Sequence, residues 1–346
     1  MNIINFFLKT NLEKSFIIGY YGGLNFGDEL LLEVILNLLK NNGVKDISFY
    51  YTSPEIYSHY HHDFGYKKIP ATPLDMLKEV FKCKNIIIGG GGLWGLDFNK
   101  NIALLSLILF FAKYFLRKKI YLIGVGYYLS TTKLGRFAGW LAGFSSDIII
   151  ARDNETFRNF SRVSRNIFID NDIVFNFHEL DEKLYTSDVD ELKKEVDISE
   201  KTIFITTRRF SGDKYASFKE EIQKFIEKNT DKKIIMALFE AKIVDKEGYN
   251  FFLDVSKKYK NITVVDFHYN PVALLFLFSY HHKNIAMISP QFHGQLVAHL
   301  TGASFLPISY DNKNSELFKS IGIKYFFDIK NVSYFDMQNF INHFYE

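Results

Sequence analysis

The alternation of short apolar runs with helix-like segments constrains the fold of this chain most. In the first half, apolar runs typical of strands fall at residues 15–21, 47–52, 85–88, 120–125 and 148–151. A helix-like segment follows each run, and the first of these, 28–41, has acidic residues in its first turn and a lysine in its last. Strands that alternate with helices in this way predict parallel βαβ units in an open α/β sheet.

A second series of the same kind follows an acidic segment. Residues 179–200 are rich in Asp and Glu, and further strands are expected at 202–206, 233–238, 262–265, 284–289 and 304–309. We therefore expect an α/β protein with two Rossmann-like domains in tandem, similar to the GT-B arrangement, and a cleft between the domains. The expected parts are an N-terminal domain at 1–178, a connection at 179–200 and a C-terminal domain at 201–346, with the last helix, 333–345, near the domain junction.

Charge and cysteine content exclude several classes of partner and site. Lys and Arg number 42 against 39 Asp and Glu, and a net charge of +3 gives no field that would draw a nucleic acid to the surface. The single Cys83 excludes a disulfide within the chain and a cysteine-based zinc site. No cluster of ligands in the sequence demands a metal ion, and we expect none.

The longest apolar stretch, residues 102–116, contains Lys113 and is shorter than the ~20 residues needed to span a bilayer. It is either a buried helix or a helix that also touches the membrane surface. Arg117, Lys118 and Lys119 follow it, and they suit anionic head groups as well as the negative end of a helix dipole. No secretory signal is evident, so we expect a cytoplasmic protein, and peripheral contact with the inner face of the membrane stays open.

A glycine-rich turn joins the first strand to the first of these helices. It contains Gly22, Gly23, Asn25 and Gly27, and the acids Asp28 and Glu29 follow directly. Glycines let a ligand approach the backbone closely, but acids in the first helical turn disfavour phosphate. The turn therefore favours sugar hydroxyls or a carboxylate base, and simple helix capping by Asp28 is the alternative.

Further glycines follow the next strands of the first domain. Ligands of open α/β sheets bind at the carboxyl ends of the strands, where these glycines fall. Either a ligand or the facing domain approaches them closely. After the fifth strand, Arg152 and Asp153 form an internal ion pair or Arg152 contacts a ligand. The glycines are Gly89, Gly90, Gly91 and Gly92 after one strand and Gly124 and Gly126 after the next.

The second domain has candidate anion-binding and acid–base residues at its strand ends. Arg208 and Arg209 follow its first strand, and the guanidinium group matches carboxylate and phosphate. His293 lies where a strand leads into a helix, and a histidine there can act as acid or base near neutral pH. Lys313 follows a later strand, in a turn that Asp311 and Asn312 can build.

These pieces, in this order, resemble the polysaccharide pyruvyl transferase family over roughly residues 16–325. The family pattern has an Asn-x-Gly-Asp turn, a glycine run, a Gly-x-Gly strand exit, an Arg-Asp pair, an Asp-x-x-Phe, a strand that ends in Arg, a Ser-x-Arg-x-His helix start and a Tyr-Asp-x-Lys turn. The matching positions begin here at Asn25, Gly89, Gly124, Arg152, Asp172, Arg208, Ser289 and Tyr310.

The resemblance implies a GT-B-like enzyme that moves a pyruvyl group from phosphoenolpyruvate to a sugar of a surface polysaccharide or its precursor, forming a ketal. It implies a carbohydrate acceptor, either lipid-linked or not, a small-molecule donor and no further cofactor. His293 is then expected as the acid and Asp28 or Glu29 as the base. The other expected site residues are Arg208, Arg209, Ser289, Gln291 and Lys313 for the donor, and Gly22, Gly23, Asn25, Gly27, Gly90, Gly91, Gly92, Gly126 and Arg152 for the acceptor side.

One position departs from the family pattern. Gln291 stands where the Ser-x-Arg-x-His start has its arginine, and glutamine carries no fixed charge. Another cation substitutes for it, or this member uses a different donor. A GT-B-type glycosyltransferase with a nucleotide-sugar donor is the first alternative, and a glycan-binding protein without activity is the second. The number of subunits stays open.

Overall fold

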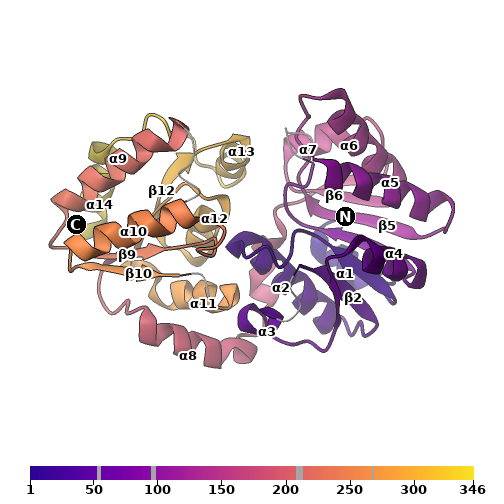
Figure 1. Cartoon of the computed structure of the whole chain (residues 1–346), viewed down its shortest axis with the longest axis horizontal. Helices are drawn as coiled ribbons and strands as arrows, with labels where there is room; N and C mark the ends of the chain where they lie inside the picture. The colour runs from indigo at the N-terminus through magenta and orange to yellow at the C-terminus, as the bar shows by residue number, and fades with distance from the viewer. Residues whose placement is uncertain (53–55, 95–98, 208–212, 267–268) are drawn as a thin grey trace. The chain divides into compact units, whose positions relative to one another are not determined.

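The chain folds into two units, each with its own parallel sheet (Figure 1). The computed structural model describes residues 1–52, 56–94, 99–207, 213–266 and 269–346. Unit 1 is made of Met1–Gly23 and Asp28–Asp181, and unit 2 of Leu24–Gly27 and Glu182–Glu346. Two parallel-sheet α/β units confirm the fold class expected from the sequence. The chain passes between units after Asp181, so most of the acidic segment 179–200 belongs to unit 2.

The sheet of unit 1 has the strand order β3-β2-β1-β4-β5-β6-β7, and every pairing within it is parallel. Its central strands are apolar because helices cover them, and β1 and β4 are buried along their whole length. The strands are β1 Ser15–Ile18, β2 Ile47–Tyr51, β3 Lys67–Pro70, β4 Asn85–Gly89, β5 Lys119–Val125, β6 Ile148–Ala151 and β7 Ile167–Ile169.

Three helices of unit 1, α4, α5 and α6, share one apolar core with the sheet. Each begins at a side-chain cap, supplied by Thr72, Asn99 and Thr132. None of the described helices is long and apolar enough to cross a bilayer. The helices are α1 Ile3–Lys9, α2 Phe26–Asn41, α3 Tyr57–Tyr60, α4 Pro73–Lys82, α5 Lys100–Tyr114, α6 Lys133–Ser145 and α7 Asn154–Phe160, with a 3-10 segment at Ile173–Glu179.

The sheet of unit 2 has the order β10-β9-β8-β11-β12-β13 and is also parallel. Its strands are β8 Thr202–Thr206, β9 Lys233–Ala237, β10 Ile262–Val265, β11 Ile285–Ser289, β12 Ser304–Ser309 and β13 Phe327–Asp328. Its helices are α8 Thr186–Glu195, α9 Asp213–Lys228, α10 Lys246–Lys258, α11 Pro271–His281, α12 Phe292–Thr301, α13 Asn312–Ser320 and α14 Tyr334–Tyr345, with 3-10 segments at Glu182–Tyr185 and His282–Asn284.

The last helix, α14, packs on unit 2. A capping box between Ser333 and Asp336 starts it, and Met337 and Ile341 enter the core beside α9. The Tyr345 hydroxyl donates to the carbonyl oxygen of Lys201 at 2.9 Å. A place near the domain junction stays a prediction.

Because all strands of a sheet run the same way, their carboxyl ends meet at one edge of each unit. In unit 1 this edge carries the glycine turns after β1, β4 and β5. In unit 2 it carries the residues after β8, β9, β11 and β12. Each edge gathers candidate residues that lie far apart in the sequence.

Candidate functional site

At the carboxyl edge of unit 2, Ser289 fixes the turn from β11 into α12. Its hydroxyl lies 2.6 Å from the Thr206 hydroxyl at the end of β8, and it accepts the backbone N–H of Gln291 at 3.2 Å. A Cβ at Gly294 would lie 2.5 Å from the Ser289 oxygen, so only glycine lets the helix approach this closely. Ser289, which the sequence predicts as a site residue, therefore holds the backbone of the turn that carries Gln291.

Gln291 is the N-cap residue of α12, yet its side chain makes no capping hydrogen bond. The side chain is buried, the residue being 6% exposed, and its Oε1 atom has no hydrogen-bond partner in the described parts of the chain. Buried polar atoms in proteins are normally paired. The N-terminus of a ten-residue helix also presents backbone N–H groups and the positive end of the helix dipole. The helix N–H groups suit an anionic ligand, and the Gln291 Oε1 atom suits a hydrogen-bond donor on that ligand.

His293 follows two residues later, in the first turn of α12, and a glycine packs against its ring. A Cβ at Gly27 would lie 1.7 Å from His293 Nδ1 and 2.4 Å from Cε1. No side chain fits in that space. The Asn-x-Gly turn and the histidine, more than 260 residues apart in the sequence, are therefore direct neighbours in unit 2.

Backbone hydrogen bonds hold this turn in unit 2 beside the end of β9. Phe26 donates its N–H to the carbonyl oxygen of Phe239 at 2.8 Å, and the two rings stack with centroids 4.3 Å apart. The Asn25 amide donates to the Glu240 carboxylate at 3.0 Å. Asn25 and Gly27, predicted on the acceptor side of the first domain, are thus part of the second unit. The reason is this strand-like pairing, which no local pattern reveals.

The exit of β12 is tied to the exit of β11. Asp311 caps α13 by accepting the N–H of Lys313 at 2.8 Å. The buried Asn314 amide donates to the carbonyl oxygens of Pro290 at 3.2 Å and Ile308 at 3.3 Å. Lys313 accordingly lies in the first turn of a helix whose start is fixed against the loop that carries Gln291.

The predicted donor arginines, Arg208 and Arg209, lie outside the described residues. The strand that leads to them is described: Thr207, just after β8, donates its hydroxyl to Asp245 at 3.2 Å. Asp245 in turn caps α10 by accepting the N–H of Gly248 at 2.9 Å. The roles of Arg208 and Arg209 stay predictions.

In unit 1, Glu29 is completely buried and fixes the glycine turn. Its carboxylate accepts the N–H of Gly22 at 2.9 Å and lies 2.8 Å from Nε2 of His61. The expectation that Glu29 acts as a base is therefore corrected: both of its oxygens are used inside the protein, and no substrate can reach a side chain with no exposure. Gly22 itself has a φ of +74°, which favours glycine.

His61 is held between two carboxylates. Its Nδ1 lies 2.6 Å from Glu33 and its Nε2 2.8 Å from Glu29, and all three side chains are unexposed. Burial alone would lower the pKa of His61, but the hydrogen bonds and charges of Glu29 and Glu33 outweigh it and raise the pKa to about 9. His61 is therefore a buried imidazolium at neutral pH. No local sequence pattern marks His61 as functional, because its partners lie 28 and 32 residues away in the chain.

Asp28 differs from its neighbour because it is partly exposed. Its Oδ1 would lie 3.4 Å from a Cβ at Gly91, so the carboxylate borders the glycine run after β4. Gly90 and Gly91 have φ values of +69° and +75°, and other residues would strain this backbone. Gly23 and Gly92 belong to the same two turns. Of the two predicted bases, only Asp28 is exposed to solvent at all.

Arg152 forms an internal ion pair, one of the two alternatives that the sequence left open. Its guanidinium group donates to Asp172 at 3.2 Å and to the Tyr128 hydroxyl at 3.1 Å, and it lies 3.7 Å from Asp153. A Cβ at Gly126 would come within 3.0 Å of Arg152. The arginine is buried and braces the turns after β5 and β6. These contacts do not support the other alternative, a ligand bound at Arg152, which stays a prediction.

No metal centre is found among the described residues: no three His, Cys, Asp or Glu side chains there are grouped so as to hold an ion. The acidic and histidine side chains of unit 1 pair with one another instead, as at Glu29, His61 and Glu33.

Two parallel-sheet α/β units of this kind define the GT-B fold class. Similar solved structures include UDP-GlcNAc 2-epimerase from Methanocaldococcus jannaschii, with a TM-score of 0.62, 15% identity and coverage of 95% of this chain and 91% of that chain. The Neisseria meningitidis UDP-GlcNAc 2-epimerase bound to UDP-GlcNAc has a TM-score of 0.60, 15% identity and coverage of 96% and 90%. Anabaena HepE in complex with UDP and glucose has a TM-score of 0.58, 13% identity and coverage of 96% and 90%.

At these identities the likeness shows the fold alone, and none of the curated proteins matches the chain in sequence. The model of the polysaccharide pyruvyl transferase family matches residues 25–312, so the chain belongs to that family and is an enzyme of that kind. The matched range begins at Asn25 and ends just after Asp311, so it includes His293 and the turn that packs against it. Family membership supports a role in the modification of polysaccharides.

Proposed function

We propose that this enzyme transfers a pyruvyl group from phosphoenolpyruvate to a sugar of a surface polysaccharide or its precursor and forms a ketal. The observation that carries the proposal is the start of α12. There, His293 packs against the Asn-x-Gly turn in the first turn of α12, beside the backbone N–H groups of the helix start. A histidine and an open helix N-terminus at one strand exit supply an acid and an anion site together.

The reaction needs a proton donor for carbon and a base for the acceptor. In our proposal His293 protonates the methylene carbon of phosphoenolpyruvate, and the positive charge that develops lies on the carbon that carries the phosphate oxygen. A sugar hydroxyl adds to that carbon and gives its proton to Asp28. A second hydroxyl of the same sugar displaces phosphate, closes the ketal and returns a proton to His293. The proton held by Asp28 leaves with the phosphate, so the products are the ketal and hydrogen phosphate.

The donor carries up to three negative charges, and the site must balance them without the family arginine. The N–H groups of α12 and the Gln291 amide provide hydrogen bonds but only partial charge. We propose that Lys313, at the start of α13, and Arg208 and Arg209, outside the described residues, supply the cations. Charge-assisted bonds to phosphate are roughly twice as strong as neutral ones, so these residues should dominate donor affinity.

On the acceptor side, Asp28 is partly exposed beside the glycine run after β4. We propose that Asp28 is the base and that Glu29, held by Gly22 and His61, keeps the turn in place. We also propose a lipid-linked acceptor and peripheral contact of this enzyme with the cytoplasmic face of the membrane. An acceptor held in the bilayer would explain why a chain with no described spanning helix carries exposed apolar helices.

A GT-B-type glycosyltransferase with a nucleotide-sugar donor is the second candidate. Gln291 favours it, because an amide in place of arginine weakens the case for a triply charged donor. Two of the similar structures were solved with UDP-GlcNAc or with UDP and glucose, and these ligands belong to those proteins. The two candidates differ in the group added and in the leaving group.

The deciding experiment mixes the enzyme with acceptor glycans and either phosphoenolpyruvate or a set of nucleotide sugars. Product mass distinguishes a pyruvyl ketal from an added hexose, and phosphate release is followed in parallel. The proposal predicts a ketal and stoichiometric phosphate with phosphoenolpyruvate. Transfer of a sugar residue, with no turnover of phosphoenolpyruvate, would replace the proposal by the glycosyltransferase alternative.

A further inference from the structure

The outer face of α4, α5 and α6 in unit 1 is unusually apolar for a surface. More than half of the large hydrophobic side chains that are exposed in the described parts of the chain lie on these helices or at their ends. They are Leu74, Leu77 and Phe81 on α4, Leu104, Leu107, Phe111, Tyr114 and Phe115 on α5 and at its cap, and Leu134, Phe137, Trp140 and Phe144 on α6. An exposed apolar group of this size marks an interaction surface.

Aromatic rings form a continuous ladder across this face. Phe137 stacks on Trp140, Trp140 on Phe144, and Phe144 on Tyr114 of the neighbouring helix, with ring centroids 5.9, 5.1 and 5.7 Å apart. Helices α5 and α6 lie side by side, as Figure 1 shows. Trp and Tyr side chains are enriched at the head-group level of membranes.

The charges of α5 and α6 have one sign, and the two acids of α4 are each paired with a lysine. Between residues 98 and 146 the sequence contains no Asp or Glu, whereas it contains seven Lys and Arg. Lys113 is paired with Asp147, just beyond the segment, at 2.5 Å. An apolar face framed by cations fits an anionic surface, and it disfavours a second copy of the chain, because an interface of this face with itself would bring cations together.

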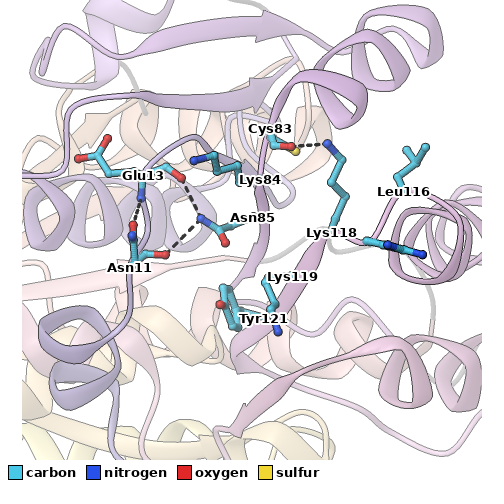
Figure 2. A pocket seen from close by; sticks show the side chains of 10 residues that line it. Asn11, Glu13, Cys83, Lys84, Asn85, Leu116, Lys118, Lys119 and Tyr121 are labelled. Carbon is cyan, nitrogen blue, oxygen red and sulfur yellow. Dashed lines mark hydrogen bonds between the residues drawn. The ribbon is translucent and has the colours of Figure 1, made fainter.

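An open pocket of about 510 Å³ lies where α4 and α5 end, at the amino edge of the same sheet (Figure 2). Lys84, Arg117, Lys118 and Lys119 line it, against a single acid, Glu13. Lys118 donates to the carbonyl oxygens of Phe81 and Cys83 at 2.8 and 2.5 Å and so fixes the wall of the pocket. Lys84 and Arg117 are exposed and available to an anion.

The pocket and the apolar face are adjoining parts of one surface. Phe115 at the end of α5 is 69% exposed, and two residues later Arg117 lines the pocket. On α4 the same order recurs, with the exposed Phe81 followed by Lys84. Apolar side chains beside cations, in the same order on two helices, match the layers of a membrane interface, with acyl chains next to phosphates.

We propose that this surface docks on a bilayer that contains anionic phospholipids, with the aromatic ladder in the interface and a lipid phosphate in the pocket of Lys84 and Arg117. The inference rests on the proposed membrane contact and not on the identity of the donor. It names the part of the protein that makes the contact and the class of lipid that it recognises.

Vesicle sedimentation tests the charge component. Wild-type protein should bind vesicles of phosphatidylcholine mixed with phosphatidylglycerol and should bind phosphatidylcholine alone far less. The double variant Lys84→Gln/Arg117→Gln should lose about fivefold in partitioning for each cation removed. The matched control Lys257→Gln/Lys319→Gln, on exposed helices of unit 2, should bind like the wild type. Equal binding of both double variants, or of both vesicle types, overturns the proposal.

Trp140 reports the apolar component directly. The chain has two tryptophans, and Trp94 is buried at 3% exposure whereas Trp140 is 42% exposed. Brominated lipids should therefore quench Trp140 on binding, and Trp140→Phe should remove the quenching while the protein still sediments with vesicles. Phe115→Ser/Phe137→Ser should weaken sedimentation, unlike the control Ile243→Ser/Tyr325→Ser. Binding without quenching would overturn the proposed orientation.

Two further outcomes would replace the proposal. If the chain dimerises in solution and Phe137→Ser abolishes the dimer, the surface is an interface between copies. If inorganic phosphate binds through Lys84 and Arg117 while vesicles do not bind, the pocket takes a free anion. Turnover of phosphoenolpyruvate on a short soluble acceptor should be unchanged in the surface variants. The membrane-docking proposal and the proposed function can therefore be contradicted independently: the first by vesicle binding, the second by turnover of phosphoenolpyruvate.

Discussion

The carboxyl edges of the two sheets differ in whether their buried polar side chains are paired. In unit 1, charged side chains satisfy one another, as Glu29, His61 and Glu33 do, and as Arg152 does with Asp172. In unit 2, the helix start after β11 leaves Gln291 Oε1 buried without a partner among the described residues. The first edge thus uses its charges to hold glycine turns, and we propose that the second edge binds a ligand.

The comparison has a physical basis. A buried charge costs several kcal/mol unless it is paired, so the buried charges that fix a loop must be paired with one another. A site for an exchangeable ligand must instead keep donors and acceptors unpaired until the ligand arrives. Changes in unit 1 should therefore lower stability, and changes at the unit 2 edge should lower activity with little loss of stability.

The largest expected effect is that of His293→Ala on turnover. Removal of a general acid costs typically ~100- to 10,000-fold, and we expect a loss of kcat in this range with an unchanged melting temperature. His299→Ala, on the same helix, is the matched control and should keep most activity. Near-normal turnover by a folded His293→Ala protein would remove this residue from the mechanism.

Arg152→Met should act on stability. Removal of one partner from a buried ion pair costs about 3–5 kcal/mol, because Asp172 would remain charged without its counter-ion. Urea denaturation measures the loss, and Lys193→Met, a half-exposed residue paired with Asp190, should cost under about 1 kcal/mol. A stable Arg152→Met protein that has lost acceptor binding would assign Arg152 to the ligand after all.

The pH dependence of stability should report the buried imidazolium. Because the pKa of His61 is raised to about 9 in the folded protein from an ordinary 6.5, its contribution is complete below pH 6.5 and is lost as the pH rises through 9. The contribution is on the order of 3 kcal/mol. The melting temperature should fall between these pH values, and His61→Gln should flatten that fall. An unchanged pH profile in His61→Gln would show that another group titrates.

The smallest expected change is a gain. Gln291→Arg adds a charge-assisted contact worth roughly 1.5–3 kcal/mol, so phosphoenolpyruvate should bind about 10- to 100-fold more tightly. Calorimetry on the wild type and the variant measures it, and Gln291→Met serves as a control of similar size without hydrogen bonds. Tighter binding by Gln291→Met as well would mean that shape, rather than charge, limits donor affinity.

Much of the fold follows from the sequence because buried parallel strands are short apolar runs. The run at 202–206 coincides with β8, and the runs at 85–88 and 120–125 differ from β4 and β5 by one residue at one end. Strand β3 was missed because its sequence Lys-Lys-Ile-Pro is that of a polar edge strand. Strands β7 and β13 have three and two residues, too few for any periodic pattern.

The candidate site was predictable where function depends on local sequence, and not where it depends on packing. Glycines and His293 stand at strand exits, which the sequence shows directly. The burial of Glu29 depends on His61, which reaches it from a different part of the chain. Residues 24–27 belong to unit 2 because they pair with Phe239 and Ala241, and no local sequence pattern encodes that contact.

The most direct test of the account is a structure of the protein crystallised with phosphoenolpyruvate. We expect the phosphate or carboxylate of the donor to accept hydrogen bonds from the backbone N–H groups at the start of α12 and from the Gln291 side-chain NH2 group, with the methylene carbon facing His293. A nucleotide bound at this helix start, with phosphoenolpyruvate absent at saturating concentration, would contradict it.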